Sequence, residues 1–254
     1  MLVAERYEKI VSLVNERGSI RVSELSELCQ VTEETIRRDL DRLEGAGRLR
    51  RSHGGAVSVK DTMLHPEIPY AVREITNADE KKRIALEAIK RISPKDRILL
   101  DASSTAWYMA SDLPDIDLTV LTNSIKVATE LSSKEKIEVI STGGTLAQRS
   151  LSFVGPLAER SLDAYHVDKV FLSCKGVHLE RGISESNEMQ ARVKERMIGM
   201  ADEVVLLADS TKFGVQAFTY VADLSQVHVI ITDKRMPKDT IEQLENRGIT
   251  VITV

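Results

Sequence analysis

The feature that most restricts the fold is an alternation of short apolar runs with helical segments through residues 78–254. Seven runs are rich in Val, Ile and Leu: residues 97–102, 118–123, 137–142, 167–176, 203–209, 227–233 and 249–254. The segments between them, and the segment 78–92 before them, read mainly as helices. Buried strands that alternate with helices are typical of a parallel sheet covered on both faces. We therefore predict a larger α/β domain with a mostly parallel sheet over residues 78–254.

Residues 1–57 follow a different pattern, which predicts a small separate domain. Three segments have helical periodicity and end near Arg17, at the turn after Cys29 and at Gly45. Ser23 and Thr32 are expected to cap the second and third helices. Two helices joined by a short turn form a helix-turn-helix. The extended runs 48–52 and 56–59 follow and enclose two glycines, which suits a hairpin or wing.

The distribution of charge indicates what this small domain binds. The whole chain has a formal net charge of -4, yet residues 35–57 contain six arginines and only three acidic residues. Such a local basic excess attracts the phosphate backbone of DNA. We expect the third helix to enter the major groove while basic side chains neutralise phosphates. The candidate DNA-binding residues are Thr32, Glu34, Thr35, Arg37, Arg38, Arg42, Arg48, Arg50, Arg51 and His53.

An ordinary solvated helix is the alternative interpretation of part of this pattern. Glu33 with Arg37, and Glu34 with Arg38, are favourable pairs four residues apart on one helix face. That interpretation does not explain the three further arginines on a glycine-tipped hairpin, or the two helices that precede the third.

The same residues resemble a known family. Thr32-x-x-Thr35-Ile36-Arg37-Arg38-Asp39-Leu40, followed by Leu43-Glu44 and His53-Gly54-Gly55-Ala56, resembles the DNA-binding motif of the DeoR family of bacterial transcriptional regulators. The resemblance implies a winged helix-turn-helix whose third helix reads double-stranded operator DNA. Asp39 belongs to the family pattern, and we expect it to orient a neighbouring arginine and not to meet phosphate.

In the larger domain, polar residues gather where the predicted strands end. In parallel sheets of this kind, ligands bind at the carboxyl ends of the strands. Ser103, Ser104 and Thr105 stand between a strand and a helix, where free N–H groups, the helix dipole and hydroxyl groups suit a phosphate. Lys212, after another strand, is a candidate for the positive charge. No glycine-rich dinucleotide or nucleoside-triphosphate motif occurs at a strand–helix junction.

The polar stretches at the ends of the predicted strands are residues 101–105, 122–123, 143–144, 173–176 and 209–214. Together with residues 182–185 and Lys194, they resemble the carboxy-terminal domain of DeoR-family regulators, which is similar to sugar-phosphate isomerases. Ser103 stands where many members have glycine. The resemblance implies that Ser103, Ser104, Thr105 and Lys212 hold a phosphate. It also implies that the sugar pocket is lined by Asp101, Thr122, Asn123, Gly143, Gly144, Lys175, Gly176 and Glu185.

We predict a regulator, most simply a repressor of a carbohydrate-metabolism operon that a phosphorylated sugar releases from DNA. Residues 1–57 are expected to bind DNA, 58–77 to form a linker, and 78–254 to bind the effector and to form a homo-oligomer, a dimer or tetramer. Two alternatives remain: an isomerase in which Glu185 or Asp101 abstracts a proton, and a DNA-binding protein whose larger domain serves only assembly.

Neither a metal nor a cofactor is expected. The only cysteines, Cys29 and Cys174, lie far apart and outside any metal-ligand spacing. The chain contains no apolar run of about 18 residues and no signal-peptide pattern, so we expect a cytoplasmic protein with no membrane contact.

Overall fold

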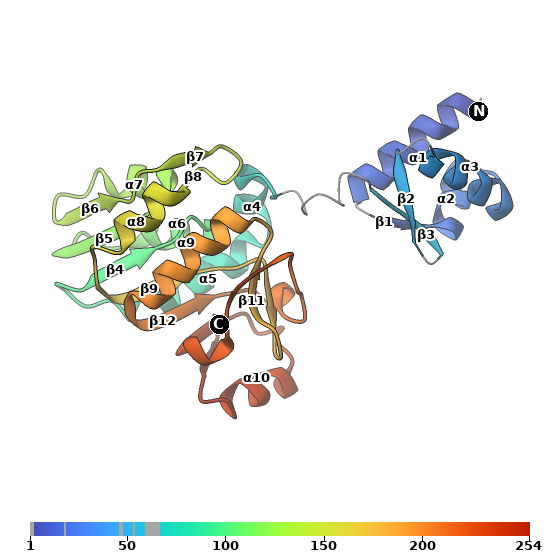
Figure 1. The fold of residues 1–254 in the computed structure, drawn as a ribbon. Helices are drawn as coiled ribbons and strands as arrows, with labels where there is room; N and C mark the ends of the chain where they lie inside the picture. Colours follow the sequence, from blue (N-terminus) through green and yellow to red (C-terminus); the bar gives the residue numbers. More distant parts are fainter. Residues whose placement is uncertain (1–2, 18, 46–47, 53, 59–66) are drawn as a thin grey trace. The chain divides into compact units, whose positions relative to one another are not determined.

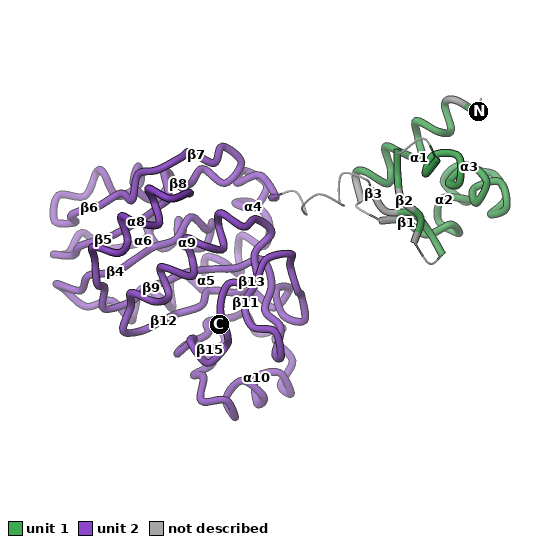
Figure 2. The backbone as a smooth tube through the Cα atoms, viewed as in Figure 1, with its two compact units in different colours: residues 1–66 green, residues 67–254 purple. Residues whose placement is uncertain are grey.

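The structure is a computed structural model that describes residues 3–17, 19–45, 48–52, 54–58 and 67–254. The chain divides into two compact units, residues 1–66 and 67–254 (Figure 2). Each unit has its own hydrophobic core. No helix in the described ranges is both long and apolar enough to cross a membrane.

The first unit is a winged helix-turn-helix, as predicted. Its helices are α1 (Val3–Arg17), α2 (Val22–Cys29) and α3 (Glu33–Gly45), and its strands are β1 (Ser19–Arg21), β2 (Leu49–Ser52) and β3 (Gly55–Ser58). The strands form one antiparallel sheet in the order β1-β3-β2, in which β2 and β3 are the predicted hairpin. Ile10, Leu25, Ile36, Leu40 and Leu43 form its core and fix α3 by one apolar face.

The two predicted helix caps have different outcomes. The backbone N–H of Thr35 donates to Thr32 Oγ1 at 3.3 Å, so the cap of α3 is confirmed. The predicted cap at Ser23 is wrong, because α2 already begins at Val22 and follows Arg21 without any side-chain cap. Strand β1 ends directly at this helix, and the N–H of Val22 donates to the carbonyl of Gly54 at 2.9 Å. The wing therefore takes the place of a side-chain cap.

The second unit is built on a seven-stranded parallel sheet, which confirms the predicted α/β class (Figure 1). The strands lie in the order β15-β14-β12-β9-β4-β5-β6. Their bounds are β4 (Arg97–Leu100), β5 (Leu118–Thr122), β6 (Ile137–Ser141), β9 (Val167–Leu172), β12 (Ala201–Leu207), β14 (Val229–Thr232) and β15 (Thr250–Thr253).

Helices cover both faces of this sheet. Along β4, Leu99 belongs to one hydrophobic cluster, whereas Ile98 and Leu100 belong to the other, because successive strand residues face opposite sides. The first cluster includes residues of α8 (Pro156–Leu162), α9 (Glu188–Gly199) and α10 (Lys238–Glu245). The second includes residues of α5 (Ala78–Ile89), α6 (Ser104–Asp112) and α7 (Ile125–Leu131). Apolar runs without strict alternation thus reflect burial on both sides.

The strand order creates a switch point between β4 and β9. From β4 the chain proceeds through β5 and β6 to one edge, and it returns on the other side of β4 with β9, β12, β14 and β15. Connections on either side of this point leave in opposite directions, which opens a crevice at the carboxyl ends of β4 and β9.

Several smaller elements were not predicted. The hairpin β7 (Thr145–Ala147) and β8 (Ser152–Val154) follows β6, and an antiparallel sheet contains β10 (Gly176–His178), β11 (Gly182–Glu185) and β13 (Thr219–Ala222). Two short 3₁₀ helices, η2 (Ser210–Lys212) and η3 (Leu224–Gln226), complete the unit. Within the segment expected as a linker, residues 67–77 instead belong to the second unit and include helix α4 (Tyr70–Ile75).

Candidate functional site

The exposed face of α3 carries the polar residues expected to read DNA. The side chains of Arg37 and Arg38 are 47% and 74% exposed, and they pair with Glu33 at 2.6 Å and Glu34 at 3.3 Å. Exposed ion pairs of this kind contribute at most about 1 kcal/mol, so DNA phosphates or bases can displace them. Thr32, Glu34 and Thr35 lie at the start of the same helix.

The other described arginines of the cluster have partners inside the unit. Arg42 donates to the hydroxyl of Tyr7 at 3.2 Å, and Arg48 donates twice to Glu8, each time at 2.8 Å. Arg51 forms an ion pair with Asp41, so it fastens the wing to α3. The backbone of Arg50 lies in β2, but its side chain and the whole of His53 lie outside the described residues.

Asp39 points inward and forms a two-point ion pair. Arg6 of α1 donates from Nε to Asp39 Oδ2 at 2.6 Å and from Nη2 to Oδ1 at 3.2 Å. The two side chains are only 11% and 5% exposed. Asp39 therefore orients an arginine, as expected, but that arginine comes from α1 and not from the cluster around α3. The pair fixes the rotation of α3 against α1.

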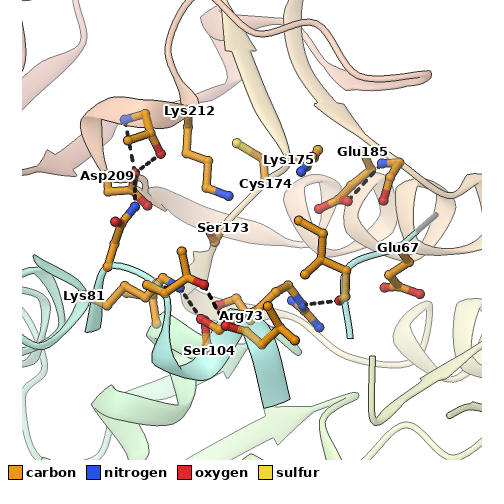
Figure 3. A pocket seen from close by; sticks show the side chains of 18 of the residues that line it. Glu67, Arg73, Lys81, Ser104, Ser173, Cys174, Lys175, Glu185, Asp209 and Lys212 are labelled. Carbon is orange, nitrogen blue, oxygen red and sulfur yellow. Dashed lines mark hydrogen bonds between the residues drawn. The ribbon is translucent and has the colours of Figure 1, made fainter. Parts of the chain in front are cut away.

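A pocket lies in the second unit, at the crevice that the strand order creates. Its volume is about 230 Å³, a little below the usual range of sites for drug-sized ligands. Its wall comes from the segments that follow β4, β9 and β12, from the end of β11, from α9 and from residues 67–81 (Figure 3). Six of the predicted effector residues line it: Ser103, Ser104, Thr105, Lys175, Glu185 and Lys212.

The start of α6 offers free hydrogen-bond donors to this pocket. Ser103 is the N-cap of the helix, and its hydroxyl accepts from the N–H of Ala106 at 3.0 Å. The N–H groups of Ser104 and Thr105 occupy the first two helical positions, where no earlier turn supplies an acceptor. Asp101 holds the loop from below by accepting from the N–H of Ser103 at 3.1 Å. The arrangement suits an anion.

Four cationic side chains line the pocket without an ion pair among the described residues: Arg73, Lys81, Lys175 and Lys212. Lys212 points into the space between the walls (Figure 3). Burial, and then the positive charge of Lys212, lower the pKa of Lys175 and lower that of Lys81 to about 8. Positive charges therefore repel one another in the pocket, and a bound anion would relieve that repulsion.

A buried ion cluster lies beside these cations. Lys194 donates to Glu185 at 2.5 Å and to the carbonyl of Ser173 at 2.6 Å, and its Nζ lies 3.2 Å from Asp101 Oδ2. Burial alone would lower the pKa of Lys194, but Glu185 and Asp101 outweigh it and raise that pKa. Burial alone would raise the pKa of Glu185, but Lys194 outweighs it and lowers that pKa. Glu185 is thus a charged carboxylate that is held in place.

The remaining predicted effector residues do not line the pocket. Asp101 is fully buried beneath it, and Thr122 donates to the carbonyl of Leu100 at 2.7 Å. Asn123 donates to the carbonyl of Phe153 at 3.0 Å. Gly144 (φ +113°), beside Gly143, and Gly176 have backbone roles: a Cβ on Gly144 would lie 2.9 Å from Val154 O, and one on Gly176 would lie 2.4 Å from Val215 O. Polar residues and glycines at the ends of strands can thus have structural roles and not line a ligand site.

Sequence reasoning missed other residues that line the pocket. Arg73 and Lys81 come from α4 and α5, before the first strand, where no local motif marks them. Lys194 contributed only to the family resemblance. Within the described part of the chain, no group of three or more His, Cys, Asp or Glu side chains is arranged to hold a metal ion.

Comparison with known proteins decides the family. A model of the DeoR-like helix-turn-helix domain matches residues 6–62, and a model of the DeoR C terminal sensor domain matches residues 76–234. The chain belongs to the DeoR family. It is thus a DNA-binding transcriptional regulator with a sensor domain for a small molecule.

Relatives in the DeoR family match along their whole length. The HTH-type transcriptional regulator YulB of Bacillus subtilis is 57% identical over 100% of this chain and 98% of its own. The L-fucose operon activator of Haemophilus influenzae is 38% identical over 97% and 98%, and the putative aga operon transcriptional repressor of Escherichia coli O157:H7 is 35% identical over 99% and 94%. These DeoR-family relatives are named as regulators and not as enzymes.

A solved structure of ribose 5-phosphate isomerase A from Methanocaldococcus jannaschii aligns with 54% of this chain and 55% of its own. Its TM-score is 0.40 and its sequence identity 20%. This likeness is too weak to support a shared activity with the DeoR-family chain.

Proposed function

We propose that this DeoR-family regulator represses a carbohydrate-metabolism operon and leaves its operator when a phosphorylated sugar binds the pocket of the second unit. The observation that carries the proposal is the set of unpaired cations that line the same pocket as the free N–H groups of α6. Relatives named for the L-fucose and aga operons support a carbohydrate system.

The phosphate of the proposed ligand binds at the start of α6. The N–H groups of Ser104 and Thr105 donate to it, and Lys212 supplies a charge-assisted bond from the opposite wall. Lys175 and Glu185 lie farther along the pocket and suit sugar hydroxyl groups, since one donates and the other accepts. The pocket thus offers charge at one end and mixed polarity at the other.

The proposed DNA interface consists of α3 and the wing. Thr32, Glu34, Thr35, Arg37 and Arg38 are assigned to the major groove, because Thr32 caps α3 and the other four lie on or beside its exposed face. The residues assigned to the phosphate backbone are Arg42, Arg48, Arg50, Arg51 and His53. Three of these, Arg42, Arg48 and Arg51, would have to exchange or share the partners described above.

We assign assembly into a dimer or tetramer to the second unit. A single helix-turn-helix buries little DNA surface, and recognition normally pairs two half-sites. The second unit exposes large apolar side chains, which a partner copy would cover: Leu146, Leu157, Met189, Phe218 and Tyr220.

An isomerase is the less favoured function. A general base works best with a pKa near the working pH, whereas Lys194 holds the pKa of Glu185 below its ordinary value. Asp101 is fully buried and accepts hydrogen bonds from the N–H groups of Ser103 and Ser173. Turnover of sugar phosphates by the purified chain would favour this alternative.

The DNA assignment is tested with Arg38→Ala. Bound sequences are first selected from a random DNA library with the parent protein, and affinities are then measured by mobility shift. Loss of a base-reading arginine costs about 1 to 3 kcal/mol and relaxes specificity at one position. Arg83→Ala, on the exposed surface of α5, is the control and should bind like the parent. Parent affinity in Arg38→Ala would contradict the assignment of Arg38.

The effector assignment is tested by adding phosphorylated and unphosphorylated sugars to the bound DNA. Release by one phosphorylated sugar, and not by its unphosphorylated form, is the expected result. If no sugar phosphate stabilises the protein or changes its affinity for DNA, the second unit serves only assembly. If the protein with a sugar phosphate instead raises transcription above the level without the protein in a reconstituted system, the regulator is an activator.

A further inference from the structure

Residues 67–77, here called the connecting wall, form one side of the pocket. They are also the first described residues of the second unit after the DNA-binding unit. The N–H of Tyr70 donates to the carbonyl of Arg149 at 2.7 Å, and the hydroxyl of Tyr108 donates to the carbonyl of Glu74 at 3.0 Å. The connecting wall is thus an ordered part of the second unit.

The connecting wall is fastened by groups that face the proposed phosphate. Ser104 Oγ donates to the carbonyl of Arg73 at 3.2 Å. Lys81 Nζ donates to the same carbonyl and to the carbonyl of Thr76, the latter at 2.7 Å. Ser104 and Lys81 both line the pocket, so an anion bound there competes with these two carbonyls for the same donors. Occupancy of the pocket and attachment of the wall therefore share hydrogen-bond donors.

Arg73 has an unused donor at this position. Its Nε donates to the carbonyl of Ile68 at 3.1 Å, whereas its Nη2 is buried and has no hydrogen-bond partner among the described residues. A buried donor without a partner is unfavourable, and it is uncommon in folded proteins. Arg73 lines the pocket and forms no ion pair among the described side chains. Nη2 has no exposed surface in this structure, so a molecule that enters the pocket can supply the missing partner once a small movement of the connecting wall uncovers this donor.

We propose that Arg73 is a ligand-binding residue that donates from Nη2 to an oxygen of the bound phosphorylated sugar, and that the connecting wall senses occupancy of the pocket through it. This inference rests on the proposed function for the identity of the ligand. The planar guanidinium can keep the bond to Ile68 while it forms a second bond to the ligand, which a lysine ammonium does not reproduce with the same geometry.

The position of Arg73 in the chain allows this contact to link ligand binding to affinity for DNA. A ligand alters affinity for DNA only if it binds two states of the protein with different strength. The connecting wall lies on the single covalent route between the two units, so a ligand that rearranges it acts on that route. Ligand binding thus acts on the first described residues of the second unit.

The test uses the full chain and its single tryptophan, Trp107, which lies two residues after Thr105 in α6. Trp107 fluorescence is titrated with inorganic phosphate, ribose 5-phosphate, glucose 6-phosphate, fructose 6-phosphate and fructose 1-phosphate. Hydrogen exchange of residues 70–77 is followed with the sugar phosphate that binds most tightly. The variants are Arg73→Met and Arg73→Lys, and the control is Arg83→Met on the exposed surface of α5.

Arg73→Met should lower the affinity for the sugar phosphate about tenfold or more, as expected for one lost charge-assisted bond. It should lower the affinity for inorganic phosphate less. The ligand-dependent change in hydrogen exchange of residues 70–77 should disappear. Arg73→Lys should lie between the parent and Arg73→Met, and Arg83→Met should match the parent.

Parent affinity and parent exchange in Arg73→Met would overturn the inference while the proposed function stands. A parent protein that binds no sugar phosphate would overturn both. If Arg73→Met does not fold, Arg73→Lys decides: parent behaviour in every measurement would show that the guanidinium is not needed.

Discussion

Lys212→Met is the sharpest test of the phosphate site, because methionine keeps most of the side-chain length and removes the charge. Lys212 has no ion pair among the described residues, and its charge lowers the pKa of Lys81 and of Lys175. The substitution removes this repulsion. We therefore expect the thermal midpoint of the unliganded protein to stay the same or to rise.

With a sugar phosphate bound, the same substitution has the opposite effect. One charge-assisted hydrogen bond is lost, which corresponds to about 1.5 to 3 kcal/mol or roughly ten- to a hundredfold in affinity. Without Lys212 the pKa of Lys81 rises, so Lys81 is more fully protonated and replaces part of the lost attraction. The expected loss therefore lies toward the lower end of that range.

Calorimetric titration with the most tightly bound sugar phosphate measures the change, and mobility shift shows whether more ligand is needed to release DNA. Lys238→Met, on the exposed start of α10, is the matched control. Parent affinity for the ligand in Lys212→Met, or release of DNA at the parent's ligand concentration, would refute the phosphate site. A large loss of stability without ligand would show that Lys212 has a structural role instead.

Two further predictions concern the first unit and the pH dependence of the second. Asp39→Ala leaves Arg6 buried without its partner and should destabilise the first unit by about 3 to 5 kcal/mol. In urea, the helical circular dichroism of that unit should be lost earlier while the Trp107 transition stays unchanged; one unshifted transition in both signals would contradict this. Affinity for a sugar phosphate should fall as pH rises through about 8, because Lys81 loses its proton there while the phosphate is already a dianion. The fall should be shallower in Lys81→Met, and an equally steep fall would exclude Lys81 as its source.

The sequence predicted those parts of the fold that rest on local patterns. The Val, Ile and Leu runs gave the seven parallel strands, and the hydroxyl of Thr32 marked the start of α3. The prediction for Ser23 was wrong because it assumed that a side chain caps α2. In the structure, β1 and the wing carbonyl of Gly54 perform that role through tertiary structure. The short helix α4 was missed because its six residues follow two prolines and form less than two turns.

The pocket was only partly predictable, for a related reason. Residues at the ends of strands, such as Ser104 and Lys212, are marked by their place in the strand–helix alternation. Arg73 and Lys81 have no such mark, since only folding of the segment before β4 brings them to the pocket. Thr122 has the right position but satisfies a neighbouring carbonyl. Sequence position identifies the edge of the sheet, and tertiary hydrogen bonds decide which side chains remain free.

The pocket draws its walls from segments that begin at residue 67 and end at residue 212, so no partly folded fragment contains it. A ligand that binds only the complete pocket stabilises the folded chain, by about 2.7 kcal/mol when its concentration is a hundred times its dissociation constant. This added stability lengthens the lifetime of the folded chain against cellular proteases. We therefore expect the metabolite to influence abundance as well as occupancy of DNA. Cells rich in the effector should degrade this regulator more slowly, and they should hold a larger reserve of it when the sugar is exhausted.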